Sequence, residues 1–233
     1  MFAVIIGTVT FYGIFAPMIA RLLKLADTNP QGVLILGGQP WARAIGKALK
    51  TNGVHTMIVD TNYSNTAAAW MEGVPAYHGS VMSEGALKDI EMAGLGRFVA
   101  LTPNDQVNTL AAQKMTRVFG RASVYRLAER HAGEGEHVEH AEGEGRVFSS
   151  TKASYRAITA LWAKNGDVQV TPLSAEYTLS DFAEEHGENA VPLFVLNESG
   201  KLTVVSPKQA VTPQNGQRLI SIVAHSAKTK TEE

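Results

Sequence analysis

The chain carries two short segments whose residue types and spacing could hold a phosphate group and a ribose. The first reads Gly37-Gly38-Gln39-Pro40-Trp41-Ala42 and follows an apolar run, so we expect it at a strand-to-helix turn. Gly37 and Ala42 fit the Gly-x-Gly-x-x-Gly/Ala fingerprint that brings backbone N–H groups close to a pyrophosphate. Gln39 stands where the second glycine belongs, and Pro40 removes one N–H donor at the helix start. The other interpretation is a tight turn with no ligand.

The second segment begins at Asp60, which closes a predicted strand 23 residues after Gly37. An acid at this position can accept hydrogen bonds from a ribose 2′-hydroxyl and repels a 2′-phosphate. The spacing therefore favours NAD or an adenosine ligand over NADP. The alternative is that Asp60 only caps the turn Asp60-Thr61-Asn62, as aspartates at strand ends often do.

A third polar segment, Thr102-Pro103-Asn104-Asp105, follows another predicted strand. It has a cap residue, a proline at the first helical position and an acid at the third, as a capped helix start does. It also lies at the carboxyl end of a strand, where ligands of open α/β sheets bind. Together the three segments predict one set of cofactor contacts: Gly37, Gly38, Gln39, Trp41, Ala42, Asp60, Thr61, Thr102, Asn104 and Asp105.

A parallel sheet would bring these segments together, and the chain has the alternating strand and helix patterns of such a sheet. Five apolar runs alternate with helical patterns: Val33–Gly37, His55–Asp60, Pro75–His78, Arg97–Leu101 and Ser123–Leu127. Strands that alternate with helices predict a parallel sheet with right-handed crossovers. We therefore expect a Rossmann-like, doubly wound α/β fold over residues 30–128.

The first twenty residues carry no charge, and Arg21 and Lys24 follow at once. This is the length of a helix that crosses a bilayer, and basic residues after it favour the cytoplasmic side. We expect residues 1–25 to form a transmembrane helix, the last of a bundle, because Ala3, Gly7 and Thr10 share one face. A signal peptide, a buried soluble helix and a single-span anchor are the alternatives.

The composition argues against nucleic-acid binding and against functions that need cysteine. The net charge of −1 over 233 residues gives no support for nucleic-acid binding, which needs a basic face. The absence of cysteine excludes disulfides, thiolate metal sites and cysteine nucleophiles.

The remaining chain divides into three parts. Residues 129–145 are rich in Gly, Glu and His and predict a polar linker. Its His137 and His140 could chelate a divalent metal, but a polar loop is the preferred interpretation and no metal site is expected. Residues 146–224 predict a small α+β domain with a hairpin at Asn197–Gly200, and residues 225–233 a disordered tail.

The segments LILGGQPWARAIGKAL, MIVDTN, AYHGS and ALTPNDQVN, followed by VYRLAER, resemble the nucleotide-binding domain that regulates potassium conductance and transport. The N-terminal VIIGTVTFYGIFAPMIARLLKL is similar to the last membrane helix of bacterial monovalent cation:proton antiporters that carry this domain. The resemblance implies binding of NAD(H) or an adenine nucleotide and homodimers coupled to a membrane partner. Gln39 and Ser80 depart from the family pattern, and both departures weaken the expected nucleotide binding.

We therefore expect a regulatory region of a cation:proton antiporter, at the inner membrane with its soluble domains in the cytoplasm. The further membrane helices of the transporter would lie outside this sequence. One alternative is an assembly module of the same transporter that has lost its ligand. The other is a soluble NAD-dependent oxidoreductase, but His186 is the only histidine in the second domain before the tail, and no pair of acids there is clearly positioned for catalysis. No enzyme activity and no catalytic residue are expected.

Overall fold

A computed structural model of the chain describes residues 2–22, 30–129, 145–150, 153–207 and 214–225. It separates into two compact units, residues 1–30 and residues 31–233. The predicted linker falls almost wholly outside the described residues, as do His137 and His140 and nearly all of the predicted tail.

In the described part of the first unit lies the helix α1 (Phe2–Leu22), which covers the uncharged stretch from residue 2 onward. Among the helices that the structure describes, none is both long and apolar enough to cross a membrane. The transmembrane helix expected over residues 1–25 therefore stays a prediction.

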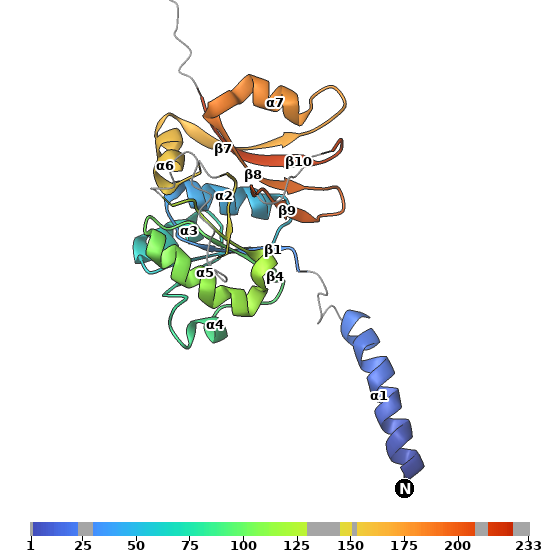
Figure 1. Ribbon diagram of the computed structural model, residues 1–233. Coiled ribbons are helices and arrows are strands. Elements are labelled where there is room, and N and C mark those ends of the chain that lie inside the picture. The colour runs from blue at the N-terminus through green and yellow to red at the C-terminus, as the bar shows by residue number, and fades with distance from the viewer. Residues whose placement is uncertain (1, 23–29, 130–144, 151–152, 208–213, 226–233) are drawn as a thin grey trace, which may run out of the picture. The chain divides into compact units, whose positions relative to one another are not determined.

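The second unit is built on a parallel sheet with the strand order β3-β2-β1-β4-β5-β6. Figure 1 labels its central strands β1 and β4. Its strands are β1 (Gly32–Leu36), β2 (Thr56–Asp60), β3 (Ala76–His78), β4 (Leu95–Ala100), β5 (Val124–Arg126) and β6 (Arg146–Val147). The predicted α/β fold with a parallel sheet is therefore confirmed. The sheet extends further along the chain than predicted, because β6 pairs with β5. The sequence pattern had placed residue 146, where β6 begins, in the second domain.

Helices cover both faces of this sheet, because neighbouring residues of a buried strand point to opposite sides. On one side Val33 and Ile35 of β1 pack with α2 (Pro40–Thr51) and α3 (Tyr63–Met71). On the other side Leu34 and Leu36 pack with α4 (Ala86–Asp89) and α5 (Asp105–Phe119). The crossovers leave the loops after β1, β2 and β4 at the same edge of the sheet.

A second, antiparallel sheet has the order β7-β10-β8-β9. Its strands are β7 (Gly166–Pro172), β8 (Ala190–Leu196), β9 (Leu202–Val204) and β10 (Arg218–Ala224), and α6 (Tyr155–Ala163) and α7 (Leu179–His186) accompany them. The predicted turn at Asn197–Gly200 forms, since the Asn197 side chain accepts a hydrogen bond from the Lys201 N–H at 2.7 Å.

The two sheets share one apolar core. The cluster that holds Val33, Ile35 and the buried face of α2 continues into Phe194 and Ile220 of the second sheet. Polar contacts lie at the border of this core: Arg97 donates to the Leu202 carbonyl at 2.6 Å, and Arg218 donates to the Asn52 side chain at 2.6 Å. The burial of Arg97 lowers the pKa of its guanidinium from the ordinary value.

Candidate functional site

The loop between β1 and α2 is a tight turn that needs glycine at its first position. Gly37 has a φ of +109°, and a Cβ there would lie 2.9 Å from the Gln39 side-chain oxygen. The Gly37 N–H donates to the Val59 carbonyl at 2.8 Å, which holds the turn against β2. Gln39 is the N-cap residue of α2, but its side chain makes no capping hydrogen bond. This side chain is therefore available for another contact.

Asp60, at the end of β2, holds the glycine turn in place. One of its carboxylate oxygens accepts from the Gly38 N–H at 2.7 Å and from the Asn65 side chain at 2.8 Å. The other oxygen accepts from the Asn62 N–H at 2.8 Å. Three of roughly four acceptor positions of the carboxylate are thus occupied, which leaves about one for a ribose hydroxyl. The predicted turn capping by Asp60 is present, and the predicted contact to a ribose remains a proposal.

Gln39 links the two strands between which the sheet order reverses. Its side-chain amide donates to the Leu101 carbonyl at the end of β4. In open α/β sheets the crevice between these two strands is where a ligand binds. The bond from Gln39 therefore crosses the place that a pyrophosphate would occupy. Pro40 has no N–H, and the Gly38 N–H already donates to Asp60. Neither backbone position therefore offers a free donor to a pyrophosphate.

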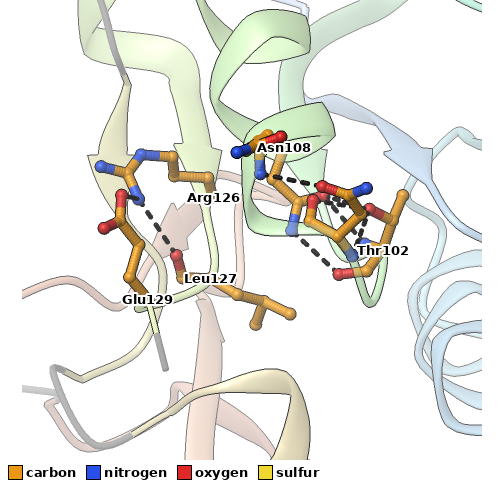
Figure 2. A network of polar contacts seen from close by, with 7 residues as sticks. Thr102, Asn108, Arg126, Leu127 and Glu129 are labelled. Atoms are coloured by element: carbon orange, nitrogen blue, oxygen red, sulfur yellow. Dashed lines mark hydrogen bonds and ion pairs between the residues drawn. The ribbon is translucent and has the colours of Figure 1, made fainter. Parts of the chain in front are cut away.

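The loop between β4 and α5 is held by an amide that the sequence analysis left out of the site (Figure 2). The Asn108 side chain accepts from the Thr102 hydroxyl at 2.7 Å and donates to the Thr102 carbonyl at 2.9 Å. Asn108 is 1% exposed, and it fixes the direction in which the loop leaves the sheet. Asn104 caps α5 by accepting from the Gln106 and Val107 N–H groups, and Asp105 begins the helix. The sequence predicted Thr102 as the cap and Pro103 as the first helical residue, but the cap is Asn104, so Pro103 precedes the helix.

Arg43 is a second site residue that the sequence did not single out. Its guanidinium donates to the Gly38 carbonyl at 2.8 Å and forms an ion pair with Glu72, also at 2.8 Å. The pair fixes the glycine turn from the α2 side. Glu72 lies 29 residues further along the chain, so no local spacing pattern connects the two.

Two of the predicted contacts point into the core instead. Trp41 is 2% exposed and Ala42 is fully buried, so their side chains cannot reach a ligand at the sheet edge. The Trp41 ring packs against Tyr155 of α6, with ring centroids 5.7 Å apart. Its indole N–H has no hydrogen-bond partner in the described part of the chain. Thr61 is exposed, and its carbonyl contacts the His78 ring at 3.1 Å.

A buried arginine ends β5 at the same edge of the sheet. Arg126 is 1% exposed, and its guanidinium lies 3.1 Å from a carboxylate oxygen of Glu129 (Figure 2). Buried arginines require such partners, because an unpaired charge in the core is costly. The sequence pattern predicts a strand at this place, but it does not indicate that the Arg126 side chain is buried. In the described ranges no group of three or more His, Asp or Glu residues could hold a metal ion.

Comparisons with known proteins give one family match, which lies within the second unit. The family model of the TrkA-N domain matches residues 33–142. A search of the curated proteins finds no match.

Similar solved structures include the GsuK channel bound to NAD, with 15% identity, 94% of this chain and 43% of that chain covered, and a TM-score of 0.43. Another is the TrkA-N domain of the inner membrane protein ybaL from Escherichia coli, with 12% identity, 44% and 76% covered, and a TM-score of 0.37. A third is the NAD(P)-binding domain of an exopolyphosphatase-related protein from Archaeoglobus fulgidus, with 13% identity, 58% and 96% covered, and a TM-score of 0.43.

The chain spans less than half of the length of the GsuK channel. Residues 33–142 match the TrkA-N domain family, and the described part of this range forms a Rossmann-like α/β fold with a parallel sheet.

Proposed function

We propose that residues 30–128 bind NAD(H) or an adenine nucleotide and regulate a cation:proton antiporter. One observation carries this proposal: Gly38, Asp60 and Leu101 meet at the carboxyl edge of the sheet, where the strand order reverses. The ribose would contact Asp60, and the phosphates would lie against the turn at Gly37 and Gly38. Thr61, Thr102, Asn104 and Asp105 would border the ligand, and Trp41 and Ala42 could contribute only backbone groups.

Regulation requires that the ligand distinguishes two arrangements of the protein, because a ligand with equal affinity for both shifts neither. We propose a homodimer whose arrangement depends on the nucleotide and biases the membrane part of the transporter. The protein would act at the cytoplasmic face of the inner membrane. The sequence resemblance and the TrkA-N match support this proposal.

The alternative proposal is an assembly module without a ligand, and the contact between Gln39 and Leu101 favours it. In that case the side chain of Gln39 takes the place of the phosphate and the domain only dimerises. An oxidoreductase finds less support, because the acids and amides at the sheet edge serve as caps and braces.

Isothermal titration calorimetry of the full chain with NADH, NAD, ATP and ADP tests these proposals, with sedimentation velocity in parallel. The sensor predicts saturable binding of at least one nucleotide and a change in the dimer. Asp60→Ala should weaken that binding, whereas Gln113→Ala, an exposed change on α5, should not. A stable dimer with no heat at millimolar nucleotide would favour the assembly module. Turnover of a nicotinamide substrate would contradict both.

A further inference from the structure

A pocket of about 480 Å³ lies between the loop after β4 and helix α6. This volume falls in the range of roughly 300–1,000 Å³ that small-molecule sites occupy. Five of its lining residues share one face of α6, and the sixth comes from the loop: Tyr155, Arg156, Thr159, Ala160, Ala163 and Pro103. None of the predicted nucleotide contacts lines it.

The walls of the pocket are mostly apolar, and its one charge is positive. Pro103, Ala160 and Ala163 and the ring of Tyr155 provide the apolar surface. Within the described parts of the chain, Arg156 has no acidic partner and no hydrogen bond. Arg156 is also the second residue of α6, where the helix dipole favours a negative charge. The Thr159 hydroxyl lies one turn away and can donate to the same anion.

The pocket adjoins both sides of the crevice between the glycine turn after β1 and the loop after β4. Pro103 follows Thr102, which Asn108 holds in place. Tyr155 packs against Trp41, which is the second residue of α2 after the glycine turn. The pocket therefore lies beside the candidate nucleotide site, and its lining comes from α6 and the loop after β4.

We propose that this pocket binds a small aromatic anion, with the ring against Tyr155 and Pro103 and the anionic group on Arg156. Arginine suits this role because its planar guanidinium forms paired hydrogen bonds with carboxylates and phosphates. A flat apolar body fits the alanine-lined wall of α6, where no larger side chain blocks it. This site goes beyond the proposed nucleotide contact and does not depend on it.

Titration of the full chain with 1-naphthyl phosphate, followed by calorimetry, tests the site. We expect saturable binding by the wild type, a loss of about tenfold or more in Arg156→Gln, and no binding in Ala160→Trp, whose indole fills the pocket. Arg117→Gln on α5 is the matched control and should bind as the wild type does. Circular dichroism checks that each variant is folded.

Equal affinity in the wild type, Arg156→Gln and Ala160→Trp would overturn the proposal, and so would the absence of binding at millimolar probe. Asp60→Ala separates this site from the nucleotide site. It should leave the affinity for naphthyl phosphate unchanged, and a parallel loss would place the probe in the crevice at the glycine turn and also overturn the proposal. The nucleotide proposal is judged independently by the NADH titration.

Discussion

The side-chain amide of Gln39 donates a hydrogen bond to the carbonyl oxygen of Leu101, and so joins the ends of β1 and β4. The two residues are 62 positions apart, and the bond crosses the crevice in which the proposed ligand would lie. A nucleotide has to displace this contact before it can reach the backbone of the glycine turn. We therefore expect this bond to lower the affinity of the proposed site for a nucleotide.

The first prediction concerns this contact. Gln39→Gly should tighten NADH binding by about tenfold or more, because it removes both the bond and the side chain that crowds the phosphates. Gln39→Ala removes the bond but keeps a Cβ, so it should give a smaller gain. Calorimetry with NADH measures both, and Gln106→Ala on α5 serves as the control. An unchanged affinity in Gln39→Gly would show that the crevice is not the binding site.

The second prediction concerns the choice between cofactors. Asp60→Ala should bring the dissociation constants of NADH and NADPH closer together, because the carboxylate that repels a 2′-phosphate is gone. Asn65→Ala removes one partner of the carboxylate but leaves its charge, so the ratio of the two constants should stay as in the wild type. The ratio is informative because a general loss of stability lowers both affinities together. A ratio that is the same in Asp60→Ala would rule out the ribose contact.

A third prediction follows from the buried amide of Asn108. Asn108→Ala leaves the Thr102 N–H and carbonyl without their partner, so we expect the free energy of unfolding to fall by about 2–3 kcal/mol. Urea denaturation followed by circular dichroism measures it. Gln113→Ala, an exposed change on the same helix, should alter stability by less than about 0.5 kcal/mol. Similar values for the two variants would mean that the loop is not held by Asn108.

The fourth prediction concerns the border between the two sheets. Arg97→Met removes the bonds to the Leu202 carbonyl and to Gln31 while keeping most of the apolar stem. We expect a loss of about 1.5–3 kcal/mol in the free energy of unfolding, as for other hydrogen bonds that a charged group makes. Arg117→Met on α5 is the exposed control. A loss no larger than that of the control would show that this contact does not stabilise the border.

The fifth prediction is a pH dependence at the start of α7. The Asp181 carboxylate accepts a hydrogen bond from the Thr178 N–H at 2.7 Å. This bond, together with one from the Thr178 side chain, lowers the pKa of the Asp181 carboxyl from 3.8. Because the folded pKa lies below the unfolded one, the carboxylate stabilises the fold above about pH 4, and this contribution is lost as the pH falls through the folded pKa. The stability difference between the wild type and Asp181→Asn should therefore be constant near neutral pH and shrink in acid. A difference that grows in acid would contradict this assignment.

The sequence alone was sufficient for the elements and for the edge of the sheet where the polar residues meet. Apolar runs and glycine spacing placed β1 through β5, because buried parallel strands leave a clear local pattern. It was not sufficient for the braces of the site. The pairs Arg43–Glu72 and Gln39–Leu101 join residues 29 and 62 positions apart, and no local periodicity reports such contacts.

Two residues show why local patterns misplace side chains. Trp41 follows the glycine turn directly and was expected to face the ligand, but the first turn of α2 directs it into the core shared with the second sheet. Arg126 falls inside the predicted strand Ser123–Leu127, and this local pattern does not indicate that its side chain is 1% exposed beside Glu129.

The apolar cluster that runs from β1 through α2 into the second sheet also determines how the chain can be divided. A fragment that ends at residue 128 would lack β6 and would expose the outer face of α2 to water. Such a fragment should aggregate, and the two sheets should melt in a single cooperative transition. The antiparallel sheet thus covers apolar surface of the parallel-sheet domain. A variant in which the two are separated would need another element to cover that surface.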